Sequence, residues 1–304
     1  MTTLPAFLDA HVHLTLIDPS TLLSGGIGRV LDLGGLRAAT MPDMPEAAYA
    51  NQFLTAPGGY PARQPWVPPG SVCTVATRED AASAVDRQVA AGASVVKVTL
   101  NSEAGPVLAD DVLEAIVARA HTHGLSVVAH AEGSGQAHRA YAAGVDMLAH
   151  TPFSERLDNE LVTAMAGPMT WISTLDIHGH GRRTAEFDLA SDNLARFHAA
   201  GGRVLYGTDL GNGPLPVGLN PREIAALLGA GLSPDDVIEA LTNDAGLNWS
   251  PGATGHVTVI AGERPSDPAD FVAWLCTARA VNRPSQHPEA PGADDQKDAH
   301  DTAD

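Results

Sequence analysis

The sequence has few cysteines, few basic residues and no long apolar run, and each shortage excludes a class of protein. Cys73 and Cys276 are the two cysteines among 304 residues, which excludes a disulfide framework and a cysteine-rich zinc motif. Lys and Arg total 18 against 36 Asp and Glu, which argues against nucleic-acid binding and a polybasic membrane contact. No membrane-length apolar run and no signal-peptide pattern occur. We therefore expect a soluble cytoplasmic protein with no nucleic-acid or membrane partner.

What the chain does have is an alternation of short strand-like runs and amphipathic helical patterns. After a first run near Ala6, seven more follow at 29–35, 71–76, 95–100, 126–131, 146–151, 170–175 and 203–209. Helical patterns between them cover, among others, 78–92, 109–124 and 191–202. Eight such units over about 250 residues predict a parallel (β/α)8 TIM barrel. The absence of a Gly-x-Gly-x-x-Gly motif after the first strand argues against a dinucleotide-binding sheet.

The domain organisation follows from where this alternation stops. The barrel is expected over 5–250, and the segment 283–304, poor in large apolar residues and rich in Pro, Gly and Asp, is expected to be a disordered acidic tail. The connection from 36 to 70 is long, rich in Pro and Gly and without clear periodicity. It is either an irregular connection from strand to helix or a loop over the catalytic face of the barrel, and we favour the loop.

Two histidines at the end of the first strand raise the question of a metal site. In the segment FLDAHVHL, His11 and His13 are two residues apart, so both side chains project from the same face of a strand. Neutral imidazoles in this arrangement suit zinc or a similar divalent ion, provided that further ligands come from elsewhere. Alone, the pair is equally consistent with two ordinary polar residues at a strand end.

Other ionisable residues lie within or at the ends of later strands. They are Lys97, His130, His150 and Asp209. Because the carboxyl ends of barrel strands meet on one face, these side chains should converge with the first two histidines. Each would be costly to bury unpaired. A carbamylated lysine would be an anionic ligand able to bridge two cations, whereas the alternative for Lys97 is a structural salt bridge, and for each histidine a hydrogen-bonded core position.

These strand motifs, taken in order, resemble the amidohydrolase superfamily, in its imidazolonepropionase-like and prolidase-like branch. The resemblance covers about 5–275 and rests on the segments FLDAHVHL, VLDLGG, TAPGGYP, VVKVTL, VVAHAEG, LAHTP and GTDLG. It implies two divalent metal ions, with zinc expected. His11, His13, Asp209 and Lys97 as a carbamate would hold one metal, and His130 and His150 the second.

The implied reaction is hydrolysis of a C–N bond in an amide, a dipeptide or a cyclic amide. Asp209 would act as general base, while the metals depress the pKa of water. Two alternatives keep the fold: a single-metal zinc deaminase, and a lactonase or esterase acting on related bonds. A third is a degenerate, non-catalytic barrel, although all six ligand-type residues are present.

Substrate-binding candidates lie on the loops that should open on the catalytic face. The main candidates are Tyr60, His178 and Arg182, and Arg63 and Arg183 are further charged residues of these loops. An arginine there could hold the carboxylate of a small-molecule substrate, although a solvent-facing charge is the simpler explanation for each.

The ends of the chain depart from the family pattern. Only six residues precede Phe7, so we expect the N-terminal half of the family's small β-sandwich to be missing. The segment 251–282 should form a reduced β remnant, in which ADFVAW most clearly resembles a returning strand. Such a remnant could be shielded in a homo-oligomer.

Overall fold

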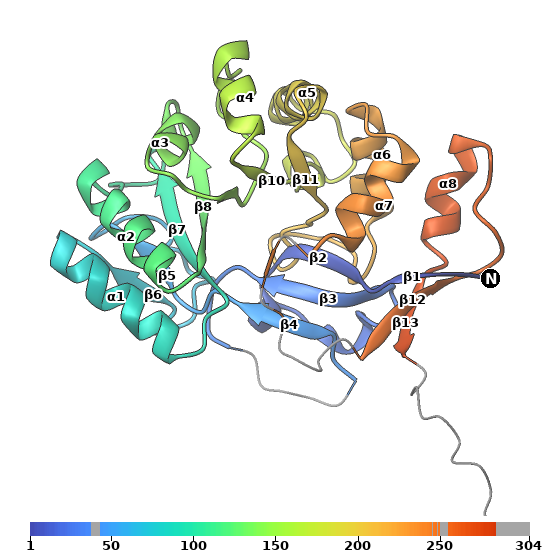
Figure 1. Ribbon diagram of the computed structural model, residues 1–304, viewed down its shortest axis with the longest axis horizontal. Helices are drawn as coiled ribbons and strands as arrows, with labels where there is room; N and C mark the ends of the chain where they lie inside the picture. The colour runs from blue at the N-terminus through green and yellow to red at the C-terminus, as the bar shows by residue number, and fades with distance from the viewer. Residues whose placement is uncertain (38–42, 245, 248, 250–254, 284–304) are drawn as a thin grey trace, which may run out of the picture.

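The chain folds as an α/β barrel, in a computed structural model that describes residues 1–37, 43–244, 246–247, 249 and 255–283. Two parallel sheets form it, with strand orders β2-β3-β4 and β11-β10-β9-β8-β7-β5-β6 (Figure 1). The strands are β2 (Phe7–Val12), β3 (Ile27–Asp32), β4 (Glu46–Tyr49), β5 (Phe53–Thr55), β6 (Val72–Thr74), β7 (Val95–Asn101), β8 (Ser126–Glu132), β9 (Met147–Leu148), β10 (Thr170–Ile172) and β11 (Arg203–Leu205).

Main-chain hydrogen bonds join the two sheets at both seams. The Ala10 N–H donates to Tyr206 O at 2.9 Å, and the Ser94 N–H donates to Tyr49 O at 2.8 Å. A further parallel bridge pairs Val12 with Leu210. These contacts bring β2 beside the segment after β11, which confirms the predicted TIM-barrel class and places the carboxyl ends of the first and last strands next to each other.

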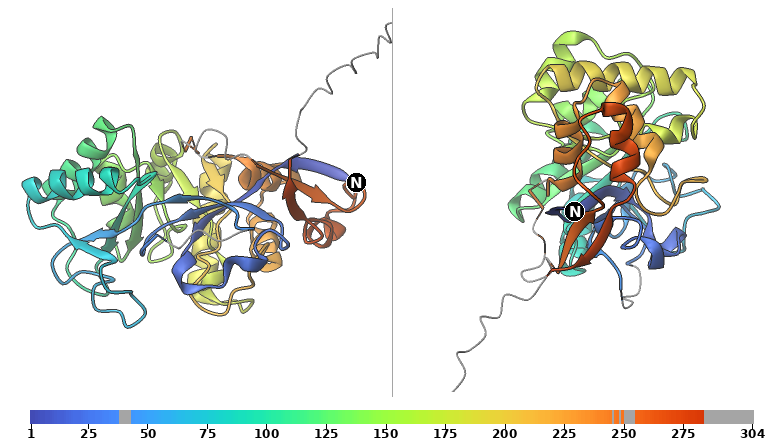
Figure 2. Two further views of the ribbon diagram at one scale, coloured as in Figure 1. Left: turned by 90° about the horizontal axis from the view of Figure 1, so that it is seen from below. Right: turned by 90° about the vertical axis from the view of Figure 1, so that its right-hand side faces the viewer.

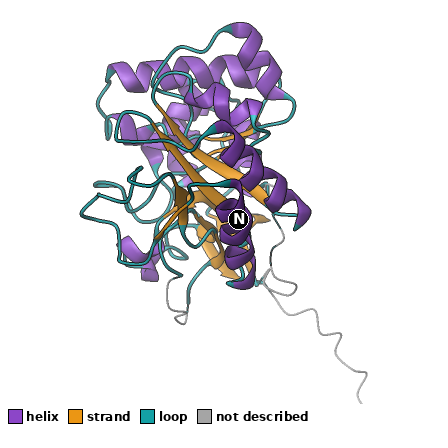
Figure 3. Ribbon diagram, turned by 90° about the vertical axis from the view of Figure 1, so that its left-hand side faces the viewer, coloured by secondary structure: helices purple, strands orange, loops and turns teal. Residues whose placement is uncertain are grey.

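Helices cover the outside of the strands, as Figure 3 shows. They are α1 (Arg78–Ala90), α2 (Asp110–Thr122), α3 (Gln136–Ala142), α4 (Asn159–Ala166), α5 (Ala185–Ala199), α6 (Pro221–Gly229) and α7 (Pro234–Thr242), with short 3-10 turns η1 (Leu14–Leu16), η2 (Pro19–Thr21) and η3 (Asp176–His178). Thr77 and Ser233 begin α1 and α7 with capping boxes, which satisfy N–H groups that have no partner within the helix. None of the described helices is long and apolar enough to cross a membrane.

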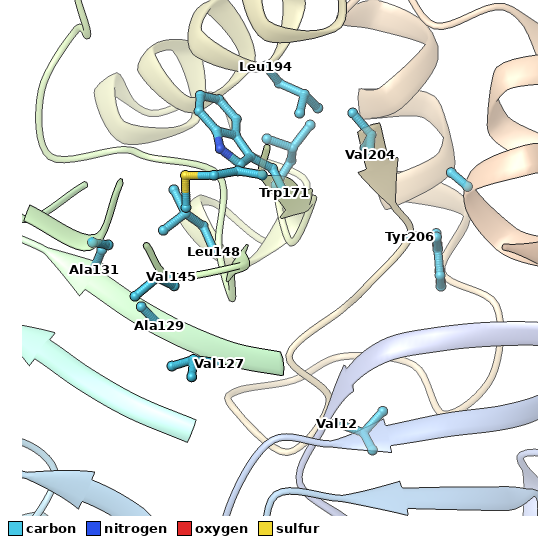
Figure 4. Close-up of a cluster of buried hydrophobic side chains, with 14 of the residues drawn as sticks. Val12, Val127, Ala129, Ala131, Val145, Leu148, Trp171, Leu194, Val204 and Tyr206 are labelled. Carbon is cyan, nitrogen blue, oxygen red and sulfur yellow. The ribbon is translucent and has the colours of Figure 1, made fainter. Parts of the chain in front are cut away.

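The apolar core fills the space between the strands and these helices (Figure 4). Trp171 of β10 stacks on Phe197 of α5 with ring centroids 3.8 Å apart, and both side chains are fully buried. Burying two aromatic side chains contributes several kcal/mol, at about 25 cal/mol per Å² of apolar surface. This packing fixes the strand ends that carry polar residues.

The sequence did not predict β4 and β5, which lie inside the connection from 36 to 70. Together they form the third strand of the barrel, interrupted at Asn51, whose φ is +60°. The strand predicted at 71–76 is present as β6, a short strand beside β5 at the edge of the sheet. Only Ala48 of β4 is buried, so no alternating pattern marks this strand in the sequence.

The terminal segments build a separate antiparallel sheet, seen at the right of Figure 1 and in both views of Figure 2. It contains β1 (Thr2–Pro5), β12 (His256–Ile260) and β13 (Arg279–Asn282), in the order β1-β12-β13. The N-terminal segment therefore contributes a strand, β1, that was not predicted from the sequence.

The prediction of a returning strand at ADFVAW is also wrong, since these residues lie in α8 (Pro268–Leu275). Asp267 caps this helix by accepting a hydrogen bond from the Ala269 N–H, and Pro268 takes the first helical position. Phe271, Trp274 and Leu275 then bury one helical face. The predicted acidic tail from 284 onward lies outside the described residues.

Candidate metal centre and substrate cavity

All six ligand-type residues predicted from the sequence lie within or shortly after barrel strands and line one cavity of about 410 Å³. They are His11, His13, Lys97, His130, His150 and Asp209, each no more than 8 % exposed. The barrel brings them together from β2, β7, β8 and the segments after β9 and β11. Ionisable groups so deeply buried need partners or a bound ion.

Asp209 lies at the centre of this cluster. Its Oδ1 is 3.1 Å from Nε2 of His11 and 3.1 Å from Nε2 of His13. His11, His150 and Asp209 each offer a ligand atom, and the three atoms lie within 4.8 Å of one another. The φ of Asp209 is +56°, a conformation that costs free energy in a residue other than glycine. Such strain at the centre of a cavity is typical of a functional residue.

Hydrogen bonds to the outer ring nitrogens orient the imidazoles of β2. His11 Nδ1 lies 2.8 Å from Ala149 O, and His13 Nδ1 lies 2.9 Å from Gly34 O. A carbonyl oxygen only accepts, so Nδ1 carries a proton in both rings. Burial would lower the pKa of His13, but its hydrogen bond to Asp209 and the charge of that carboxylate raise it. His11 is neutral, and its Nε2 presents a lone pair to the cavity. In neutral His11 that lone pair faces the Asp209 carboxylate, so two hydrogen-bond acceptors oppose each other. A cation between them would stabilise this arrangement.

The other two histidines are oriented by side chains. His150 Nδ1 is 2.9 Å from Thr174 Oγ1, and Thr174 itself has a φ of +45°. His130 Nε2 is 2.9 Å from Oε2 of Glu132, which also accepts a hydrogen bond from Asn101. An ionised carboxylate only accepts, so His130 donates from Nε2 and its Nδ1 is the nitrogen left to coordinate.

The protonation states of the cluster suit a divalent cation. Burial holds the pKa of His11 and of His150 well below the ordinary value, so both imidazoles are neutral. Burial lowers the pKa of Lys97 to about 7, against the opposing attraction of Asp209. Burial would raise the pKa of Asp209, but His11, His13 and His150 together hold it well below its usual range. Neutral imidazoles and an ionised carboxylate are the donors that zinc-type ions prefer.

A buried carboxylate below the cluster ties the first strand to the last. Asp9 Oδ1 accepts hydrogen bonds from the His11 N–H and the Thr208 N–H, and Oδ2 accepts from Thr208 Oγ1 at 2.6 Å. Burial raises the pKa of Asp9 to about 7. Its position two residues before His11 was visible in the sequence, but its partner at 208 was not.

Asp32 supports His13 in a similar way from the end of β3. Its Oδ1 accepts from the Gly34 N–H, and Gly34 O in turn accepts from His13 Nδ1. A Cβ on Gly34 would lie 2.3 Å from the ring of Phe53, so this close approach requires glycine.

Two of the three main predicted substrate-binding residues line this cavity, and the third does not. Tyr60 and His178 line it, whereas Arg182 lines a second surface cavity together with Arg222. Lining residues that sequence reasoning missed include Phe53, Trp66, Phe153 and Glu132. Phe53 and Trp66 lie in the segment without periodicity, so no pattern marked their orientation.

The strands of this parallel α/β barrel bring imidazoles, a lysine and an aspartate into one cavity. Such a cavity is typical of an enzyme site suited to a divalent metal. The model of the amidohydrolase family matches residues 2–246. The chain therefore belongs to the amidohydrolase family, which confirms the predicted enzyme class.

Solved structures support the fold. Ochratoxinase of A. niger superposes with a TM-score of 0.73 at 18% identity, over 91% of this chain and 81% of that one. A protein described as a prolidase from Bifidobacterium longum gives 0.69 at 20% identity, over 94% and 82%. Molinate hydrolase gives 0.69 at 13% identity, over 96% and 87%. A search of curated protein sequences returns no match.

Proposed function

We propose that this amidohydrolase is a metal-dependent hydrolase that cleaves a C–N bond in a small amide, dipeptide or cyclic amide. The observation that carries the proposal is the position of Asp209, whose Oδ1 lies 3.1 Å from two histidine Nε2 atoms inside a closed cluster of further ligand-type residues. The names of the superposed proteins, a prolidase, ochratoxinase and molinate hydrolase, are consistent with this class of reaction.

Two divalent ions, with zinc expected, would be held by two sets of residues. His11, His13, Asp209 and a carbamylated Lys97 form the first set, and His130 and His150 form the second. The low pKa of Lys97, about 7, supports carbamylation because the neutral amine is the form that reacts with carbon dioxide. When bound, the ions would polarise the scissile carbonyl and lower the pKa of water.

Asp209 is the general base in this proposal. It takes a proton from the attacking water and returns it to the nitrogen of the leaving group. Asn212 Nδ2 donates to Asp209 Oδ2 at 2.8 Å, which orients the carboxylate while leaving Oδ1 towards the histidines. Phe153 packs on His178 with ring centroids 4.3 Å apart, and this contact helps to exclude water from one side of the cavity.

The single-metal deaminase remains the second candidate, and lactones or esters the nearest alternative substrates. Lys97 favours the two-metal hydrolase, because it is 2 % exposed and lines the same cavity as the four histidines. The deaminase would leave that amine unmodified and without a role.

The test is elemental analysis of protein purified without chelator and with bicarbonate present, followed by assays on matched amides, dipeptides, cyclic amides and lactones. We expect about two divalent ions per chain and hydrolysis of C–N bonds that a chelator abolishes and added metal restores. One ion together with ammonia release from amino-substituted rings would favour the deaminase. Protein without a tightly bound ion would overturn the proposal.

Self-association through the β1-β12-β13 sheet is a separate proposal, which light scattering tests.

A further inference from the structure

The cavity has an aromatic wall beside the metal cluster. We use this name for Phe53, Tyr60 and Trp66. Tyr60 stacks on His130 at 5.0 Å, Trp66 lies 6.3 Å from both Tyr60 and His13, and the rings of Phe53 and Trp66 meet edge to face at 6.2 Å. Trp66 is 37 % exposed, so the wall continues to the mouth of the cavity. Such a surface favours a flat apolar group.

Outside the six proposed metal ligands, the described lining of the cavity offers a substrate carboxylate no ammonium or guanidinium group. Glu132 is the one carboxylate among those described residues, and 27 % of its side chain is exposed. A substrate carboxylate beside Glu132 is therefore repelled by a like charge and gains no compensating ion pair there.

The arginines that could have recognised a carboxylate lie elsewhere. Arg182 and Arg222 line the second cavity, where Arg222 Nη2 is 2.8 Å from the Asp176 carboxylate. Arg63 is exposed and is not a lining residue of the described site.

Two ring nitrogens remain for the polar part of a substrate. The Nε2 atoms of His178 and His180 are buried in the cavity without a hydrogen-bond partner among the described residues. Burial of a ring nitrogen without a partner costs free energy, which a substrate carbonyl or amide could recover. Burial lowers the pKa of His178 to about 4, so its imidazole is uncharged and suits an uncharged partner.

We propose that the substrate is an amide-type compound that presents a flat apolar group to the aromatic wall and carries no carboxylate. The inference rests on the proposed C–N hydrolysis and narrows it. It separates this chain from enzymes that cleave dipeptides or N-acyl amino acids, whose substrates carry a free carboxylate next to the scissile bond. Glu132 is the specificity-determining residue, and Trp66 is the contact for the flat group.

Matched substrate pairs test this proposal. N-benzoylethylamine and N-benzoylglycine differ by one carboxylate, as do acetanilide and 4-acetamidobenzoate. We expect kcat/KM for the uncharged member to exceed that of its partner by on the order of tenfold, and to exceed that of N-acetylethylamine, which has no ring. Equal or better turnover of the carboxylates would overturn the inference and leave the hydrolase itself intact.

If no pair is hydrolysed, the proposed function fails for these amides, and binding then decides the inference. The Kd of each compound is measured from quenching of tryptophan fluorescence, with Trp66→Phe showing which part of the signal comes from the cavity mouth. Tighter binding of the uncharged members supports the inference. Tighter or equal binding of the carboxylates, or no binding of any ring compound, overturns it.

Two variants assign the selectivity to residues. Glu132→Gln keeps an acceptor for His130 but removes the charge, and should raise the relative kcat/KM of the carboxylate member by roughly tenfold. Glu103→Gln, an exposed carboxylate outside the cavity lining, is the matched control. Metal content equal to wild type shows that the site is intact. If Glu132→Gln loses metal, the variant Trp66→Ala is used in its place. It should lower kcat/KM for substrates with a ring and leave kcat/KM for N-acetylethylamine unchanged. An unchanged kcat/KM ratio between the two members of a substrate pair in metal-replete Glu132→Gln would contradict the role of Glu132. An unchanged ratio between ring substrates and N-acetylethylamine in Trp66→Ala would contradict the role of Trp66.

Discussion

His11 Nε2 lies 3.1 Å from Asp209 Oδ1, although His11 belongs to the first strand of the barrel and Asp209 follows the last. The main-chain bond from the Leu210 N–H to His11 O and the bond from the His13 N–H to Leu210 O hold these strand ends in register. Closure of the barrel therefore also assembles the candidate metal site.

Replacement of Lys97 tests the two-metal centre. We expect Lys97→Ala to reduce bound metal from about two ions per chain to about one or fewer, because the carbamate oxygens are lost. Added acetate or propionate, which supplies a carboxylate of similar size, should restore part of the metal and the activity. The control is Arg182→Ala, which removes a cation from the neighbouring cavity. Full metal content in Lys97→Ala would rule out a ligand role for this lysine.

Asp209→Asn tests the general base. The amide keeps the size of the side chain but cannot take the proton, so kcat should fall by about 10²–10⁴-fold. Asn212→Ala, which removes the orienting hydrogen bond, should reduce kcat far less. Steady-state kinetics on metal-replete protein measures both, and elemental analysis separates loss of the base from loss of metal. Similar rates for Asp209→Asn and wild type would exclude Asp209 as the base.

Asp9→Ala tests the buried carboxylate that links the two strands. It would leave the N–H groups of His11 and Thr208 without an acceptor, at a cost of about 1–3 kcal/mol for each buried group. We expect a lower thermal midpoint and weaker metal binding from the same change. Asp111→Ala, an exposed position on α2, is the control and should leave both unchanged. A thermal midpoint equal to wild type would show that Asp9 does not hold the strands together.

Glu223 should make stability depend on pH. It accepts from the N–H groups of Leu175 and Asp176, which begin the loop that carries His178, and burial raises its pKa from 4.5 to about 7. Between these values the folded state holds a proton that the unfolded state has lost. The free energy of unfolding therefore falls as pH rises from 4.5 to 7 and levels off above, by at most on the order of 3 kcal/mol.

Urea unfolding of wild type and Glu223→Gln at pH values from 5 to 8 checks this expectation. Because glutamine does not ionise there, the advantage of wild type over the variant should shrink as pH rises through that window. The comparison cancels contributions from other titrating groups that both proteins share. An advantage that stays constant across the range would show that burial does not raise the pKa of Glu223 in the folded protein.

The sequence predicted the barrel and its ligand-type residues because both depend on local patterns. Alternating strands and helices specify parallel connections, and polar residues ending apolar strands mark the catalytic face. The segment from 36 to 70 resisted prediction for a physical reason: β4 buries only Ala48, and its continuation into β5 depends on the positive φ of Asn51. The helix at α8 was mistaken for a strand because a short apolar run has the same composition in either structure.

The sequence by itself determined which ligand-type side chains of the barrel strands reach the cavity, since side-chain direction along a strand follows from its two-residue repeat. Only the tertiary structure decided how those groups work together. It set the protons of His11 and His13 through carbonyl groups of Ala149 and Gly34, which are distant in sequence. It also placed the aromatic wall beside the cluster and turned Arg182 towards another cavity. Loop conformation depends on what packs against it, and no local repeat records that.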